Sequence, residues 1–334
     1  MRQLILRGLL FALQPLRHST GRWTLIERML GLKLTLREFE SVRLACDASG
    51  KSLGAYYYWK LSQVAQMMAI RRLNNRATLE LIEKSDATDY AALNALACDP
   101  RGSLLAIPHH GSFVFSIVAL VEKLRHKRPV FVFYDPPEVH ATNEIFDVLY
   151  RRLYEDPSSG VTILHNNRSG IATALKQLKQ GAVVVIMPDV YKEREDTYQI
   201  PFCGRARNVM LGTAVLARRT QATILPMLSD PSDTGMGFKT CFGMLIEPSH
   251  CATESGPRSP AVTLCEDYRT TEALFRQLEQ FMCQRLIHWQ YCRTHYLGQP
   301  APPKLEAQEL VRLSALFLKD PRVYVNRNAP MVLE

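Results

Sequence analysis

The chain has 334 residues, of which 47% are hydrophobic and 22% charged, a composition typical of a globular protein with a large core. Its 41 lysines and arginines outnumber its 32 aspartates and glutamates, for a net charge of +9. This excess indicates an anionic partner, such as an acidic carrier protein, a phosphate-bearing ligand or an anionic membrane surface. No basic run is interleaved with aromatic residues, so we expect no nucleic-acid partner.

The cysteines carry no disulfide or metal signature. There are eight of them, and none forms a Cys-x-x-Cys pair or shows the spacing of metal ligands. We therefore expect free thiols in a reducing compartment, which favours a cytoplasmic location, and no structural zinc site.

The amino-terminal segment is apolar and basic. Leu4 to Leu16 is apolar apart from Arg7 and Gln14, which is shorter than the roughly 20 apolar residues that span a bilayer. Basic residues outnumber acidic ones over residues 1–45. Such a segment either lies peripherally on an anionic membrane, at the inner face of the cell membrane, or packs on the body of the protein with a solvated basic face.

The first hundred residues read as helical. Apolar residues have helical spacing over 53–72 and 78–83, with a break at Asn74–Asn75, and an alanine- and leucine-rich run predicts a helix over 85–96. Residues 1–100 are therefore predicted to form a helical amino-terminal region packed on the core.

After residue 100 short β-branched runs alternate with helical stretches. This alternation predicts an α/β fold with a mainly parallel central sheet flanked by helices on both faces. Strands are expected at 104–107, 130–134, 161–164, 183–187 and 222–228, helices at 113–124, 142–154, 169–179 and 208–220, and an irregular stretch at 189–207.

The carboxyl-terminal third gives a weaker pattern. Residues 238–246 alternate like a strand between a loop at 229–237 and a polar loop at 248–260, and 270–291 reads as a long helix whose apolar stripe faces the core. A short helix is expected over 305–318. These boundaries give an α/β domain over 101–297 and a carboxyl-terminal helix and tail over 298–334.

Titratable side chains follow several of the predicted strands. Because parallel strands bring their carboxyl ends to one edge of a sheet, where ligands bind in open α/β folds, we expect these side chains to converge. Imidazole also suits proton transfer near neutral pH. The candidates are His109, His110, Asp135, His165 and Asp189.

Two sequence blocks resemble the late acyltransferases of lipid A biosynthesis, which belong to the lysophospholipid acyltransferases. The family's H-x-G-N-W-E block after the first core strand stands here as HHGSFV, His109 to Val114. A second block, Met187 to Pro226, is similar in order and spacing to the family's acidic segment, F-x-G turn and alanine-rich helix. The resemblance covers roughly residues 100–295.

The resemblance implies transfer of an acyl group from a thioester, on acyl carrier protein or coenzyme A, to an amine or hydroxyl of a lipid precursor or specialised metabolite. It implies no tightly bound cofactor and a histidine as general base. Arg168, Arg205 and Arg207 are candidates to bind a phosphate or the phosphopantetheine arm, with Asp135 and His165 also at the substrate site.

The chain departs from the family at one position. In the family an Asp or Glu follows the histidine with four residues between and orients the imidazole, whereas here that position holds Val114, or Phe115 counted from His110. Three interpretations remain open. In the first, Asp189 or Asp135 orients the histidine, or the second histidine shares the role of the base. In the second, the acceptor is a stronger nucleophile such as an amine, which reacts without an oriented base. In the third, the protein is a non-catalytic homologue that binds an acyl chain or carrier protein.

Overall fold

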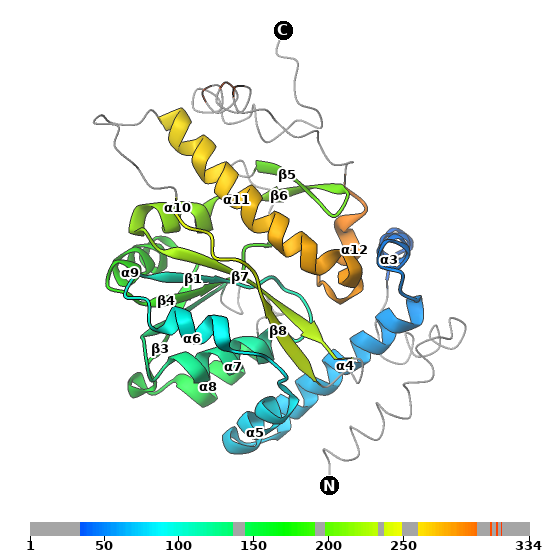
Figure 1. Ribbon diagram of the computed structural model, residues 1–334. Helices are drawn as coiled ribbons and strands as arrows, with labels where there is room; N and C mark the ends of the chain where they lie inside the picture. The colour runs from blue at the N-terminus through cyan, green and yellow to red at the C-terminus, as the bar shows by residue number, and fades with distance from the viewer. Residues whose placement is uncertain are drawn as a thin grey trace.

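The computed structural model describes residues 34–135, 144–190, 198–232, 237–248 and 260–298, together with residues 308, 312 and 315 (Figure 1). The apolar basic segment at the amino terminus lies outside the described residues, and so does most of the helix expected over 305–318. Within the described ranges, no helix combines the length and the apolar character needed to cross a membrane.

The predicted helical amino-terminal region is confirmed over its described part. It comprises α3 (Leu36–Ser49), α4 (Leu53–Arg72), α5 (Asn75–Ser85) and α6 (Ala91–Ala97). Side-chain caps fix the starts of the first three: Thr35 forms a capping box with Glu38, and Ser52 and Asn74 each accept a hydrogen bond from the first turn of their helix. In Figure 1, α3 lies beside α12 (Cys292–His295), and α4 contacts α3.

The prediction of a helix over 85–96 is wrong for its first half, because α6 begins only at Ala91. Asp86 forms a β-bridge with Phe238, and its carboxylate accepts hydrogen bonds from the Thr88 N–H and the Tyr90 hydroxyl. The segment before α6 is thus held extended by pairing with a distant strand, which outweighs its local helical preference.

The central sheet is mixed but mostly parallel, as predicted. Its strands are β1 (Ser103–Ala106), β2 (Val130–Tyr134), β3 (Val161–His165), β4 (Val183–Ile186), β7 (Thr223–Pro231) and β8 (Phe238–Phe242). They lie in the order β3-β2-β4-β1-β7-β8, and β8 runs antiparallel to β7 at one edge. The two central strands, β4 and β1, are therefore neighbours although about eighty residues separate them in sequence.

Helices cover both faces of this sheet (Figure 1). Those on one face are α6, α7 (Phe113–Leu124) and α8 (Glu144–Tyr154), and those on the other are α9 (Arg168–Lys179), α10 (Gly212–Thr220) and α11 (Pro260–Met282). Along β1, Leu104 and Ala106 join one hydrophobic cluster, while Leu105 and Ile107 join the cluster on the opposite face. Burial on both faces explains why the strand is continuously apolar.

The stretch expected to be irregular contains a β-hairpin. Strands β5 (Tyr198–Phe202) and β6 (Arg205–Val209) pair antiparallel around the two-residue turn Cys203–Gly204, in which both residues have positive φ. Alternate residues of β5 are buried against α11. Because β6 takes up residues 208 and 209, α10 begins at Gly212 and not at residue 208 as expected.

The long carboxyl-terminal helix is shifted toward the amino terminus relative to the prediction. It starts at Pro260, a residue suited to the first helical turn, and ends at Met282, where a 3-10 helix (Cys283–His288) follows. The expected core role of the stripe is confirmed, because Leu274, Leu278, Leu286 and Trp289 are buried and Phe281 packs, partly buried, against the same core.

Candidate active site

A tight turn at the carboxyl end of β1 presents the first candidate residue. After Ile107 and Pro108 the chain reaches His109, then passes through Gly111 into α7. Gly111 has a φ of +59°, and a Cβ there would lie 2.2 Å from the carbonyl oxygen of Ser229. Only glycine can bring the backbone this close to Ser229, so the turn packs directly against β7.

Asp189 lies against His109 because β4 is the parallel neighbour of β1, with Ala106 paired to Ile186. His109 Nδ1 is 2.8 Å from Asp189 Oδ1, and the backbone N–H of His109 donates a 2.9 Å hydrogen bond to Asp189 Oδ2. The carboxylate therefore holds both the main chain and the ring of the histidine. The His109 side chain remains 12% exposed, whereas that of Asp189 is 1% exposed.

Two further side chains hold Asp189 in place. The indole of Trp289 donates a 2.8 Å hydrogen bond to Oδ2, and the Arg207 guanidinium donates a 2.7 Å hydrogen bond to the backbone carbonyl. Arg207 in turn stacks on the rings of Trp289 and Tyr291, at 4.9 and 4.8 Å from their centroids. Asp189 is thus held by β6, through Arg207, and by the segment after the 3-10 helix, through Trp289.

The charge on Asp189 determines the tautomer of His109. Burial opposes ionisation of this carboxyl, but the charge and hydrogen bonds of His109 and the hydrogen bond from Trp289 outweigh it and hold the pKa of Asp189 below its usual value. An ionised carboxylate only accepts hydrogen bonds, so Nδ1 of His109 carries the proton. Nε2 is then the ring nitrogen that can accept a proton.

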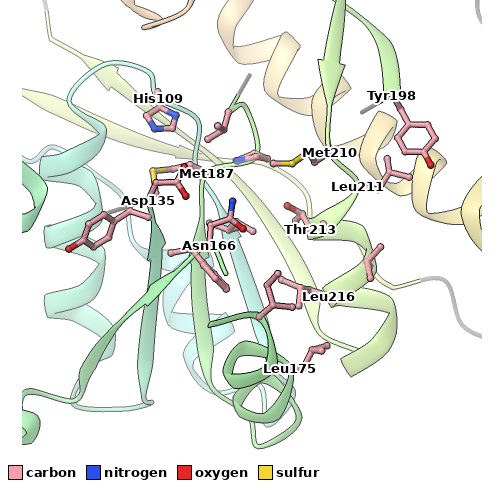
Figure 2. Close-up of a pocket in the computed structure, with 18 of the residues that line it drawn as sticks. His109, Asp135, Asn166, Leu175, Met187, Tyr198, Met210, Leu211, Thr213 and Leu216 are labelled. Atoms are coloured by element: carbon pink, nitrogen blue, oxygen red, sulfur yellow. The ribbon is translucent and has the colours of Figure 1, made fainter. Parts of the chain in front are cut away.

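His109 stands at the edge of an apolar cavity of about 650 Å³. Figure 2 shows His109 at one end of the cavity and Leu175 and Leu216 at the other. The wall is mainly aliphatic and aromatic, with Asp135, Asn166 and other polar groups among the lining residues. This combination, an apolar pocket with a few convergent polar groups, is typical of a small-molecule or acyl-chain site.

Comparison with known families agrees with this architecture. Residues 60–296 match the family described as bacterial lipid A biosynthesis acyltransferase, which is most of the chain. The chain belongs to this family. No curated protein matches it. Family membership supports acyltransferase activity of the lipid A biosynthesis type.

In this lipid A acyltransferase relative, the carboxylate that contacts the histidine does not come from position 114. Val114 lies in the first turn of α7 and packs, partly buried, against the hydrophobic core. The contact is made instead by Asp189, eighty residues later in the chain. Of the two rim carboxylates considered from sequence, Asp189 reaches the imidazole, whereas Asp135 lines the cavity wall.

The second histidine is turned into the protein. His110 is 0% exposed, and its Nδ1 and Nε2 each lie 2.9 Å from a backbone carbonyl oxygen, of Ser229 and Arg285 respectively. It is not among the residues that line the cavity. Burial lowers the pKa of His110, although both carbonyls act in the opposite direction. The structure therefore places His110 as a link between β7 and the 3-10 helix.

The remaining candidates divide by position. His165 and Arg168 are exposed at the end of β3 and the start of α9, and neither lines the cavity, although the neighbouring Asn166 does. Arg205 is half-buried and lies over the ring of Tyr296. Arg207 is buried beneath Asp189.

Sequence reasoning missed Trp289 and Arg219. Trp289 was assigned to the core stripe, where its ring indeed lies, but its N–H also serves the site. Arg219 is an exposed residue of α10 that borders the cavity. The block Arg218–Arg219 at the end of a predicted helix was the only sequence signal for it.

Proposed function

We propose that this protein transfers an acyl group from a thioester, carried by acyl carrier protein or coenzyme A, to the amine or hydroxyl of a lipid precursor or a specialised metabolite. His109 is the general base and Asp189 is its orienting acid. The observation that carries this proposal is the 2.8 Å contact between His109 Nδ1 and Asp189 Oδ1 at the edge of the apolar cavity.

The chemistry follows from the tautomer. His109 Nε2 takes the proton of the acceptor as its oxygen or nitrogen attacks the thioester carbonyl carbon. The tetrahedral adduct then collapses, the carbon–sulfur bond breaks, and the leaving thiolate receives the proton from the imidazolium. Asp189 stabilises that imidazolium, as the acid of a catalytic triad does. This series of reaction steps needs no covalent enzyme intermediate and no tightly bound cofactor.

The cavity suits the acyl chain of such a donor. Its lining is predominantly apolar, and it begins at His109, so a chain lying along it would place its thioester carbonyl next to the base. Asp135 and Asn166 stand beside the same opening, where a polar acceptor would lie. His165, Arg168 and Arg205 are candidate contacts for the donor outside the cavity. The net charge of +9 favours an acidic carrier or the anionic inner face of the cell membrane.

The test is an acyl-transfer assay with purified full-length protein. Acyl carrier protein and coenzyme A, each loaded with a labelled acyl group, are incubated with a panel of amine and hydroxyl acceptors. We expect thioester loss with a labelled product for the wild type, and loss of turnover in His109→Ala. His126→Ala, an exposed histidine after α7, is the matched control and keeps full activity.

A non-catalytic homologue would behave differently. It would bind the acyl carrier protein without consuming the thioester, and His109→Ala would leave that binding unchanged. The donor is identified in the same experiment, because the carrier-bound and coenzyme-bound thioesters are tested side by side.

A further inference from the structure

Three side chains of metal-ligand type meet outside the site described above. Cys203 occupies the turn of the β5–β6 hairpin, Glu279 lies in the last turn of α11, and Cys283 is the first residue of the 3-10 helix that follows. One ligand atom from each lies within 4.8 Å of the other two, and the two sulfurs are 3.9 Å apart. We propose that Cys203, Glu279 and Cys283 bind a thiophilic divalent cation, with zinc as the preferred ion.

The distance between the sulfurs matches two thiolates on one zinc ion. With zinc–sulfur bonds of about 2.3 Å and a tetrahedral angle, two ligand sulfurs stand roughly 3.8 Å apart. A disulfide would require about 2.05 Å between the same atoms. The observed 3.9 Å therefore needs almost no change for a metal but a large displacement for a disulfide.

Glu279 is already oriented toward the cluster. Its Oε1 accepts the backbone N–H of Cys203, which fixes the carboxylate beside the hairpin turn. A carboxylate has two oxygens, so it can keep this hydrogen bond and still ligate an ion. Glu279 and Cys283 are four residues apart across the junction of α11 and the 3-10 helix, and their ligand atoms lie within 4.8 Å of each other.

The backbone conformation of Cys203 in the hairpin turn is unusual for a cysteine. Its φ is +46°, and the following Gly204 has a φ of +74°. This left-handed pair favours Asn, Asp or Gly at the first position, and a cysteine there carries a conformational cost. Cys203 is therefore not the residue that the turn conformation favours.

The surroundings suit an ion that is held by three protein groups. Cys203 is buried, while Glu279 and Cys283 are half-buried, so an ion can reach the site and retain a water molecule as its fourth ligand. The metal would tie the hairpin, which carries Arg207, to the segment that leads to Trp289. Both residues hold Asp189, so the ion would act as a structural clamp behind the acid.

Direct metal binding tests the site without any activity measurement. Full-length protein is stripped of metal under a phosphine reductant and titrated with zinc against a chromophoric chelator, and separately with cobalt(II). We expect one equivalent of zinc per chain. The cobalt form should show a sulfur-to-cobalt charge-transfer band in the ultraviolet and the strong visible bands of tetrahedral coordination.

Variants assign the ligands. Cys203→Asn removes the thiol and suits the positive φ; its melting temperature without metal checks that it folds, because position 203 is buried. We expect its zinc affinity to fall at least 100-fold. Cys283→Ser should have the same effect, and Glu279→Gln a smaller one. Cys98→Ser, at an exposed cysteine outside the cluster, should bind zinc like the wild type. Zinc should raise the melting temperature of the wild type and of Cys98→Ser, but not of Cys203→Asn.

The proposal fails if the wild type binds no more zinc than the Cys203→Asn/Cys283→Ser double variant. It also fails if the cobalt charge-transfer band persists in that double variant, or if mass spectrometry under the same reducing conditions finds a Cys203–Cys283 disulfide. None of these results bears on the acyltransferase proposal, which rests on His109 and Asp189.

Discussion

The indole of Trp289 donates its N–H to the same oxygen of Asp189 that accepts the backbone N–H of His109. Trp289 is 1% exposed and its ring packs edge-on against Phe202, so the donor cannot turn away. The catalytic acid proposed here is therefore positioned by a residue that does not line the cavity.

Replacing Trp289 by Phe should slow the chemical step. The change keeps an aromatic ring but removes a buried hydrogen bond to a charged group, worth about 1.5–3 kcal/mol, which corresponds to roughly a 10- to 100-fold fall in kcat. KM for the acyl donor should change little, because the cavity is untouched. Trp59→Phe is the matched control: this buried tryptophan packs against His288, and its loss should lower the melting temperature but not kcat. Equal effects of both variants on kcat would contradict a positioning role.

Asp189→Asn should be much more damaging than any change at Val114. The amide cannot stabilise an imidazolium by charge and favours the wrong tautomer, so we expect kcat to fall by about two to four orders of magnitude, by analogy with the serine-protease triad. Asp147→Asn, a carboxylate bonded to Tyr134 and Arg151 outside the dyad, serves as control.

Val114→Glu restores the acid at the family's usual position and should not raise activity. The Nδ1 of His109 is already bonded to Asp189, and a carboxylate at a partly buried position that now packs against the core adds a desolvation cost. We expect unchanged or lower kcat and a lower melting temperature. A steep rise in kcat would show that Asp189 does not serve as the orienting acid.

Substitutions of the two adjacent histidines should have different effects, one on stability and the other on turnover. His110→Asn removes a buried ring that lies between the carbonyl oxygens of Ser229 and Arg285 and, when neutral, donates a hydrogen bond to one of them, so we expect a loss of stability of about 1–3 kcal/mol, with kcat changed less than tenfold. His109→Ala should do the reverse, abolishing turnover with little effect on stability. Urea unfolding and the acyl-transfer assay on both variants give the comparison.

His110 should also make stability depend on pH. Because burial lowers its pKa in the folded state, the unfolded chain takes up a proton as the pH falls through about 6.5 while the folded protein does not. The free energy of unfolding should therefore be constant above that pH and fall below it. The facing charges have opposite signs, since Arg285 disfavours the imidazolium and Asp189 favours it. Urea titrations at pH 7.5 and pH 5.5 should show a smaller difference for His110→Asn than for the wild type.

The far end of the cavity should limit the length of the acyl chain. Leu175→Trp adds bulk at the end of the cavity opposite His109, so long-chain donors should lose kcat/KM while short-chain donors keep it. A series of carrier-bound acyl groups of increasing length provides the measurement, and the shortest member is the internal control. Uniform loss across the series would indicate misfolding or a different chain path.

The strand-and-helix alternation correctly placed His109 and two carboxylates at one edge of the sheet, but it also placed there His110, which is buried away from the cavity, and His165, which does not line it. His109, Asp135 and Asp189 each follow a strand; His109 and Asp135 line the cavity, and Asp189 lies buried behind His109. The choice between the two carboxylates depends on strand order: β4 lies between β2 and β1, so Asp189 is one strand from His109 and Asp135 is two. Nothing local in the sequence determines that order.

Other parts of the site depend on contacts that leave little trace in the sequence. Trp289 lies in an apolar stripe, and burial of its ring hides the use of its N–H. The hairpin that carries Arg207 was read as irregular because its turn, Cys203–Gly204, lacks the usual Asn or Asp. The spacing of the cysteines gives no sign of the metal-ligand cluster, because Cys203 is brought next to Glu279 and Cys283 only by the fold.

The pairing of β1 with β4 has a consequence for protein engineering. In a chain whose acid follows its histidine within one helix turn, the reactive pair can be moved between scaffolds as a single peptide. Here residues 104–124 transplanted alone would carry the imidazole without its carboxylate, and an insertion in either strand would shift one partner past the other. A functional chimera must therefore exchange both central strands as a unit.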